Sequence, residues 1–410
     1  MNVSKIPTIR FNNYIDAWKH SFLMDEVNIR RGLTYKPTDI RSGGVRVLRS
    51  SNIIDGTFAL FDNDVFVKKE IVNIPKICNG DILVTAANGS SRLVGKHALV
   101  NDLSKDDFMV HGGFMLVFST NQSGFINSWM NSNEFIKALK LIQGGNGAIG
   151  NLSMSILKNM KITLPSGGEQ SAIGSFFCTL DDLIANFKVN LANYQLFKAT
   201  MLFKMFPKVG QTVPEIRLDG FKEDWELLEI NDLANCFQSG GTPKTNVQEY
   251  WDGDIPWIQS SDLETNCLFE VKVQKSISEF GLKNSSAKLI PKDSIAVVTR
   301  VGVGKLAVMR HEYSTSQDFL SISNLKSNIE FTAYLLYRLL QKEVTQLQGT
   351  SIKGITREEL LSKKVFLPSL PEQQAIGAYF LNLDQLITSY QEKITQLETL
   401  KNKLLQDMFI

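Results

Sequence analysis

Cysteine, histidine and long apolar runs are scarce in this sequence. Its 410 residues include 4 histidines and 4 cysteines, the latter being Cys78, Cys178, Cys236 and Cys267. Their wide spacing, without any C-x-x-C pair, argues against a disulfide framework or a zinc site and predicts four ordinary thiols. No apolar run approaches the ~18 residues that cross a bilayer, and the first residues do not resemble a signal peptide. We therefore expect a cytoplasmic protein with no membrane partner.

An excess of one charge is also missing, because the formal net charge is only +2. That value by itself favours no class of partner. The charge is uneven along the chain, however, since the segment 28–50 contains a single acid, Asp39, among many bases. Those bases are Arg30, Arg31, Lys36, Arg41, Arg46 and Arg49. They can neutralise phosphates or form a solvated, loop-rich face, and the segment alone does not decide between the two.

Two blocks of sequence occur twice in the chain. The pattern Pro-x-Ile-Arg-x-x-x-Tyr/Phe-x-x-x-Trp occupies residues 7–18 and returns at 214–225. The block 164–206 returns at 367–409, with the same Leu-Pro, Glu-Gln, Ala-Ile-Gly, Leu-Asp and Met-Phe groups. A chain of this length holds two to four domains. The duplication predicts two similar halves in a pseudo-twofold, circular repeat.

The second block is predicted to be a long helix in each copy. A Ser-x-x-Glu capping box stands at 166–169 and again at 369–372. Apolar residues then follow a 4-3 spacing that one lysine interrupts at the same place in both copies, Lys198 and Lys401. This pattern predicts two long antiparallel helices wound as a coiled coil. The expected seam residues are Ile173, Phe177, Leu180, Ile184, Leu191, Ile376, Phe380, Leu383, Ile387 and Ile394.

The segments outside the helices are predicted to be globular domains. They contain short β-branched runs, such as 81–85 and 294–299, separated by glycine-rich turns and possible short helices. The expected fold class is α+β, with two compact domains and two helical spacers. The predicted boundaries are 1–148 for the first domain, 149–210 for the central spacer, 211–350 for the second domain and 351–410 for the C-terminal spacer.

Catalytic motifs are poorly represented. Residues 302–305 and 94–96 resemble pieces of a phosphate-binding loop, but they lack its spacing and are better interpreted as tight turns. Glu270-Val-Lys272 ends like a nuclease motif without the Pro-Asp that should precede it. The histidines are isolated, so no catalytic residue and no metal site is predicted.

A nucleic-acid-binding function is better supported. Tyr35, Trp251 and Trp257 lie among basic and amide side chains that can contact phosphates and base edges. The alternative for Trp18, Trp225 and Trp257 is a place in the domain cores, which is the more common role of tryptophan. The residues that we expect to contact DNA are Arg30, Arg31, Arg46, Arg49, Asn52 and Arg92 in the first domain and Lys244, Gln259, Arg300, Lys305 and Gln317 in the second.

The sequence resembles one known family over essentially its whole length. The stretch 225–233 that leads into Ser239-Gly-Gly-Thr-Pro243, with Ile255-Pro-Trp-Ile258 after it, resembles the start of a target recognition domain of type I restriction-modification specificity subunits. The stretches 367–373 and 164–170 resemble the entry to that family's helical regions. The first half departs from the pattern at 31–37, which indicates a recognition domain of another sequence type and two different half-sites.

The resemblance implies a non-catalytic specificity subunit that recognises a bipartite, asymmetric site on double-stranded DNA. It also implies partners, namely two methyltransferase subunits with S-adenosylmethionine and restriction or motor subunits that use ATP and Mg²⁺. The chain itself is expected to hold no cofactor. Two alternatives stay open: a duplicated coiled-coil scaffold that binds proteins, and a self-contained restriction or methylation enzyme. The enzyme is disfavoured because neither half has an Asn/Asp-Pro-Pro-Tyr/Phe sequence.

Overall fold

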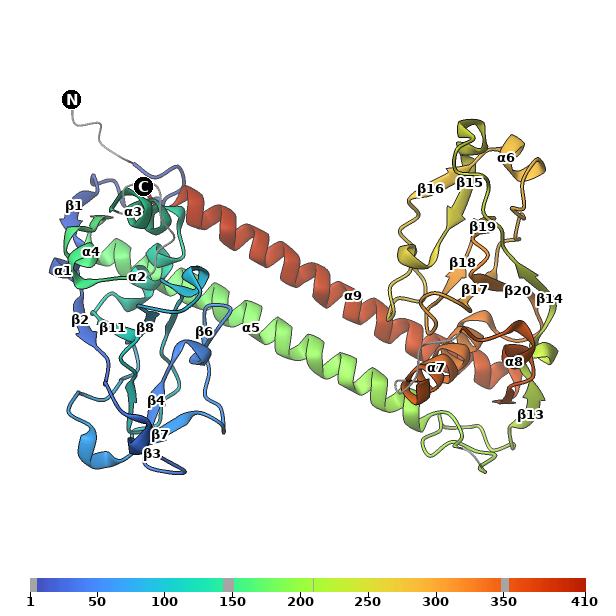
Figure 1. Cartoon of the computed structure of the whole chain (residues 1–410), viewed down its shortest axis with the longest axis horizontal. Coiled ribbons are helices and arrows are strands. Elements are labelled where there is room, and N and C mark those ends of the chain that lie inside the picture. Colours follow the sequence, from blue (N-terminus) through green and yellow to red (C-terminus); the bar gives the residue numbers. More distant parts are fainter. Residues whose placement is uncertain (1–5, 143–150, 209, 348–353) are drawn as a thin grey trace. The chain divides into compact units, whose positions relative to one another are not determined.

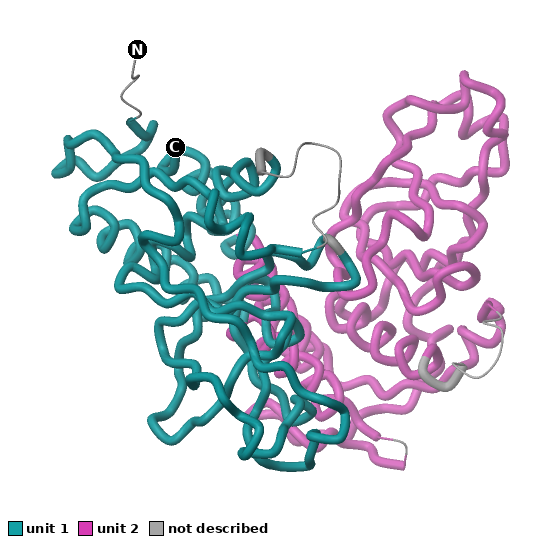
Figure 2. Tube along the Cα trace, turned by 60° about the vertical axis from the view of Figure 1, so that its left-hand side comes forward, with its two compact units in different colours: residues 1–188, 393–410 teal, residues 189–392 magenta. Residues whose placement is uncertain are grey.

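The computed structural model describes residues 6–142, 151–208, 210–347 and 354–410. The chain forms two compact units, one of residues 1–188 with 393–410 and the other of residues 189–392 (Figure 2). Each unit contains one domain of mixed strands and helices and a part of both long helices (Figure 1). This is the duplicated α+β fold that the sequence predicted.

The two long helices are α5 (Gly167–Lys204) and α9 (Leu370–Asp407). The Ser166 hydroxyl caps α5 by accepting a hydrogen bond from the Glu169 amide at 3.4 Å, as a capping box requires. Both carboxylate oxygens of Glu169, however, accept from Arg10. The glutamate of this predicted box therefore ties an N-terminal segment to the helix.

The lysines that interrupt the heptads have acidic partners on the other helix. Lys401 lies 2.5 Å from Asp181 in the first unit, and Lys198 forms an ion pair with Asp384 in the second. Residue numbers rise along α5 as they fall along α9, so the helices run antiparallel. At each predicted break in the apolar seam, the lysine therefore forms an ion pair with an aspartate of the other helix.

The expected seam residues occupy two kinds of environment. Leu180 and Ile184 pack with Leu397 of α9 as a helix–helix seam. Toward the helix starts, the seam residues instead enter the domain cores: these are Ile173 and Phe177 in the first domain and Ile376 and Phe380 in the second. Of the others, Ile387 and Ile394 are buried, while Leu191 and Leu383 are half-buried.

The first domain opens and closes with a strand pair, β1 (Lys19–Phe22) and β12 (Lys161–Leu164), which are antiparallel. One sheet has the order β2-β11-β8-β9-β6-β5 and another the order β10-β4-β7-β3. Their strands are β2 (Asn28–Arg31), β3 (Ile40–Arg41), β4 (Val45–Leu48), β5 (Ile53–Ile54), β6 (Thr57–Phe58), β7 (Val65–Val67), β8 (Ile82–Thr85), β9 (His97–Leu99), β10 (Met109–His111) and β11 (Met115–Ser119). The short helices are α1 (Leu23–Glu26), α2 (Ser123–Met130), α3 (Asn133–Ile142) and α4 (Met154–Asn159).

The second domain repeats this plan between β13 (Glu226–Glu229) and β21 (Lys364–Leu367). Its sheets have the orders β14-β20-β17-β18 and β16-β15-β19. The strands are β14 (Ala234–Ser239), β15 (Trp251–Ile258), β16 (Lys275–Ile277), β17 (Ser294–Val298), β18 (Leu306–Met309), β19 (Ser314–Thr315) and β20 (Phe319–Leu325), and the helices are α6 (Glu279–Lys283), α7 (Ile329–Leu347) and α8 (Arg357–Leu361).

The two domains share a central arrangement even where their sequences differ. Strand β11 pairs antiparallel with β2 and β8, as β20 does with β14 and β17. A glycine directly follows the first strand of each arrangement, and a Cβ atom at Gly32 would lie 1.9 Å from the Gly112 carbonyl oxygen. The same atom at Gly240 would lie 2.3 Å from the Thr315 carbonyl oxygen and 2.4 Å from the Ser316 carbonyl oxygen. Both positions therefore require glycine because the backbone passes too close for a side chain.

The repeated tryptophans and Met-Phe pairs lie in the domain cores. Trp18 contacts Phe409, from the last residues of the chain, with ring centroids 6.3 Å apart. Trp225 contacts Phe206 in the same way at 6.0 Å. The core role expected for these tryptophans, and for the buried Trp257, is confirmed.

Membrane-spanning helices, metal-binding clusters and disulfides are absent from the described part of the chain. None of its helices combines the length and apolar character of a membrane span. Among the same residues, no three His, Cys, Asp or Glu side chains gather in a way that could hold a metal ion. All four cysteines are free thiols.

Candidate nucleic-acid interface

In the first domain, a hairpin loop packs on a short turn. The loop joins β8 to β9, and the turn is the 3-10 helix η2 (Ser50–Asn52). Asn88 Nδ2 donates to Ser50 Oγ at 3.2 Å, and Lys96 Nζ donates to the Ser50 carbonyl at 3.4 Å. The loop is therefore held at two points against the turn.

The second domain builds the same arrangement from β17, β18 and the 3-10 helix η7 (Ser260–Asp262). Lys305 Nζ donates to the Ser260 carbonyl at 3.2 Å and to the Leu263 carbonyl at 2.8 Å. Lys96 and Lys305 therefore occupy equivalent positions, since each donates to the carbonyl of the first serine of the short turn. Lys305, in the tight turn predicted at 302–305, thus binds backbone carbonyls. Gly302 and Gly304 have positive φ angles of 90° and 103°, as such a turn requires.

The residue before each short turn is equivalent in the two domains. The Arg49 amide donates to Asn52 Oδ1 at 2.8 Å, and the Gln259 amide donates to Asp262 Oδ2 at 3.1 Å. Because the same hydrogen bond fixes the backbone in both domains, Arg49 and Gln259 occupy equivalent positions in the two folds. Arg49 is exposed and Gln259 is half-buried.

A third loop, which directly precedes strand β11 in the first domain and strand β20 in the second, is hydrogen-bonded to the start of the hairpin loop. The Ala86 amide donates to the Phe114 carbonyl at 2.9 Å, and the Thr299 amide donates to the Asp318 carbonyl at 2.7 Å. We call the three joined loops the loop cluster. It comprises residues 49–52, 86–96 and 112–114 in the first domain and 259–262, 299–305 and 316–318 in the second.

Most of the exposed residues predicted to contact DNA lie on the loop clusters. Arg49 and Arg92 are exposed in the first domain, and Arg300 and Gln317 in the second. Gln317 is oriented by Thr242 Oγ1, which donates to its amide oxygen at 2.5 Å. The clusters therefore present guanidinium and amide groups, which are the side chains that pair with base edges.

Two further predicted residues, Arg31 and Lys244, are exposed outside the clusters. Arg31 ends β2, next to the glycine that both domains require. The Lys244 carbonyl accepts a hydrogen bond from Trp251 Nε1 at 3.2 Å. Trp257 Nε1 donates to the Gly241 carbonyl at 3.1 Å, so both indoles fix the glycine-rich loop that precedes Lys244.

The remaining predicted residues are engaged inside the domains. Arg30 is paired with Asp81 at 2.6 Å, and Arg46 is paired with Asp64 at 2.5 Å. Asn52 is completely buried, and its amide nitrogen donates to the Ala59 carbonyl and to Asp64. Together with Lys305, these residues organise the loops. We do not include them among the residues proposed to read bases.

Asn88 and Phe114 also belong to the first loop cluster but were not among the residues predicted from the sequence. The correspondence of the two clusters was not predicted either, although the sequence contains a signal for it. Ser-Ser-Asn at 50–52 matches Ser-Ser-Asp at 260–262, and Val-Gly-Lys at 94–96 matches 303–305. A comparison of the halves at these short motifs would have aligned the domains.

His111 lies beside the first loop cluster and is completely buried. Burial, the largest cause, lowers the pKa of its imidazole to about 4. The neutral ring makes a hydrogen bond of 3.2 Å from Nε2 to the Arg30 carbonyl. The uncharged imidazole therefore stabilises β2 by donating a hydrogen bond, and it does not provide a positive charge that could bind phosphate.

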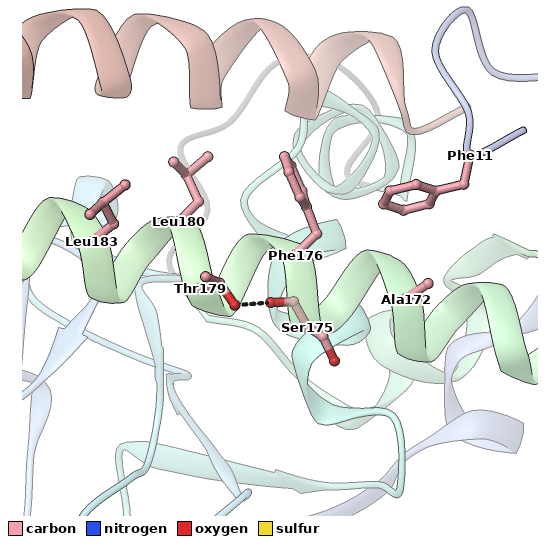
Figure 3. Close-up of a pocket in the computed structure, with 7 residues that line it drawn as sticks. All are labelled: Phe11, Ala172, Ser175, Phe176, Thr179, Leu180 and Leu183. Carbon is pink, nitrogen blue, oxygen red and sulfur yellow. Dashed lines mark hydrogen bonds between the residues drawn. The ribbon is translucent and has the colours of Figure 1, made fainter.

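A second surface feature lies on α5 and is mainly apolar. It is an open hollow of about 460 Å³ in the first unit (Figure 3). The ring of Phe11 faces Phe176 there, with centroids 6.0 Å apart. The other lining residues are Ala172, Ser175, Thr179, Leu180 and Leu183. An apolar hollow on a helix suits another protein better than it suits DNA.

Comparison with known families identifies the class of this duplicated fold. The model of the type I restriction modification DNA specificity domain matches the chain twice, at residues 15–194 and 222–399. The chain belongs to this family, as its sequence resemblance predicted.

Similar proteins include specificity subunits from archaea and bacteria. The putative type I restriction enzyme MjaX specificity subunit of Methanocaldococcus jannaschii is 23% identical over 409 residues, covering 95% of this chain and 92% of the relative. The EcoKI specificity subunit of Escherichia coli K12 is 25% identical, covering 92% and 82%. The MjaIX specificity subunit of M. jannaschii is 27% identical, but that match spans only 51% of this chain and 49% of the relative.

Solved structures show the same fold. The crystal structure of a type I restriction-modification system S subunit from M. genitalium covers 99% of both chains with a TM-score of 0.62 at 15% identity. A structure from work on complex assembly and conformational transition of the type I restriction-modification system covers 96% of this chain and 97% of the other, with a TM-score of 0.55 at 17% identity. At these identities the likeness shows the fold alone.

Proposed function

We propose that this chain is the non-catalytic subunit that reads DNA sequence for a type I restriction-modification complex. Each domain reads one half of a bipartite, asymmetric site on double-stranded DNA. The observation that carries the proposal is that one loop cluster is built twice on equivalent hydrogen bonds but with different side chains. A constant backbone with variable polar side chains is what two readers of different half-sites need.

The exposed side chains and the half-buried Gln259 divide between the half-sites. In the first domain, Arg31, Arg49 and Arg92 suit guanine edges, which accept two hydrogen bonds from a guanidinium group. In the second, Gln259 and Gln317 suit adenine, while Lys244 and Arg300 suit guanine or phosphate. The two domains should therefore select different bases.

The helices offer a surface for partner subunits. Two residues that line the hollow, Phe176 and Leu180, correspond in the repeat to Tyr379 and Leu383 of α9. Because the helix sequence occurs once per half, we assign its surface to two copies of one protein, the methyltransferase subunit. S-adenosylmethionine belongs to that subunit, and ATP and Mg²⁺ belong to separate restriction or motor subunits. We place this DNA-reading chain in the cytoplasm.

The test is methylation by the chain with and without its methyltransferase partner. The purified chain alone should transfer no methyl groups, and the complex should methylate one bipartite sequence. The complex should also be retained on DNA in a salt-dependent manner, because phosphate contacts release counterions. Methyl transfer by the pure chain, or retention that does not depend on salt, would contradict the proposal.

A further inference from the structure

Phe114 is an exposed aromatic residue within a polar loop cluster. Its side chain is 75% exposed, although large aromatic side chains are usually buried. It follows Gly112 and Gly113 and directly precedes β11. Single exposed hydrophobic residues are common on protein surfaces, but Phe114 lies in the same loop cluster as Arg49 and Arg92, which are proposed to contact DNA.

The backbone of Phe114 is fixed in place. Its carbonyl accepts hydrogen bonds from the amides of Ala86 at 2.9 Å and Ala87 at 3.1 Å. The next residue, Met115, donates to the Gly112 carbonyl at 2.8 Å. The ring therefore projects from a rigid turn, which is the preorganisation that a specificity contact requires.

The chemistry of DNA limits what this ring can recognise. In the major groove, base edges present hydrogen-bond donors and acceptors, and the C5-methyl group of thymine is the apolar feature among them. Arg49 and Arg92 on the same cluster can bind the polar edges, but a phenyl ring cannot. The corresponding residue of the second domain is Asp318, whose carbonyl accepts from Thr299 at 2.7 Å. A carboxylate at that position suits the cytosine amino group instead.

We propose that Phe114 contacts the C5-methyl group of one thymine in the first half-site. The inference rests on the proposed function of the chain. Phe114 and its counterpart Asp318 would then occupy the same specificity position, which is apolar in the first domain and acidic in the second.

The experiment uses the complex with its methyltransferase subunit and duplexes that carry the mapped target. Each thymine of the first half-site, on either strand, is replaced singly by deoxyuridine, which removes only the methyl group. One replacement should weaken binding by the wild-type complex about four-fold, the loss that corresponds to one buried methyl group. The Phe114→Ala complex should bind the unmodified duplex more weakly and should no longer respond to that replacement.

Two controls separate this contact from a general effect. Phe108→Ala removes another exposed phenylalanine of the same domain, 46% exposed, and should keep the response to deoxyuridine. Replacements in the second half-site should affect wild type and Phe114→Ala equally. The thymine contact is contradicted if no replacement weakens wild type, if the first half-site has no A·T pair, or if Phe114→Ala still responds. If the complex shows no sequence-selective binding at all, the proposed function itself has failed.

Discussion

Arg10 binds both carboxylate oxygens of Glu169 at 2.7 Å, and Arg217 binds those of Glu372 at 2.8 Å. The two glutamates are buried and stand in the first turns of α5 and α9. The hydrogen bond to Glu169 is the largest cause of the raised pKa of the Arg10 guanidinium. Each pair fastens the segment before a domain to the helix after it.

Removing the charge of Glu169 should destabilise the first unit. Glu169→Gln leaves Arg10 without its bidentate partner, and breaking a buried pair of this kind costs about 3–5 kcal/mol. Urea unfolding followed by circular dichroism measures the loss. The matched control is Glu398→Gln, which breaks the exposed pair with Lys188 and should change stability by less than about 1 kcal/mol. Equal losses in both variants would show that the Arg10 pair has no special role.

The buried lysine of α5 provides a second stability prediction. Lys198 pairs with Asp384, whose other oxygen accepts from the Tyr334 hydroxyl at 2.6 Å. Lys198→Met should destabilise the second unit by roughly 3 kcal/mol because it leaves a carboxylate uncompensated. The double variant Lys198→Met, Asp384→Leu should recover most of that loss in the same urea titration. A double variant less stable than the single one would mean that the ion pair itself is required.

Acid should weaken the first domain through His111. Its pKa is about 4 when folded and 6.5 in the unfolded chain, so only the unfolded state takes up the proton between these values. Stability conferred by the neutral ring is thus fully present above pH 6.5 and is lost as the pH falls toward 4, by up to roughly 3 kcal/mol. His111→Gln should flatten this dependence in unfolding measured at each pH. Some slope will remain from His97, whose pKa burial also lowers. His311→Gln, at an exposed position, should change nothing, and a similar flattening there would contradict the assignment.

Exposed and buried predicted residues should behave differently toward DNA. Arg92→Ala and Arg300→Ala should each relax one base position of their own half-site by about 1–3 kcal/mol in binding to a set of single-base variants. Asn52→Ala should instead lower the thermal stability of the first domain, because its buried amide binds Ala59 and Asp64. Relaxed base selection by Asn52→Ala with unchanged stability would overturn the distinction.

The sequence predicted the duplicated architecture but only part of the interface. The heptads and the repeated blocks indicated the helices, since helix periodicity is a local property. The pairing of Arg30 with Asp81 and of Arg46 with Asp64 could not be seen, because those partners are brought together by sheet formation. In sequence, an arginine that binds an aspartate and one that faces solvent look alike. Phe114 was missed for a related reason, since an exposed phenylalanine has no pattern that separates it from a core residue.

The most direct test of the account is a domain exchange followed by methylation mapping. Residues 1–148 are replaced by the first domain of another specificity subunit whose target is known, and the modified bases are mapped genome-wide in cells that carry the methyltransferase partner. The account predicts that one half-site changes to that of the donor while the other stays as in wild type. If both half-sites change together, or if neither changes in a hybrid that still methylates DNA, the two domains are not separate readers.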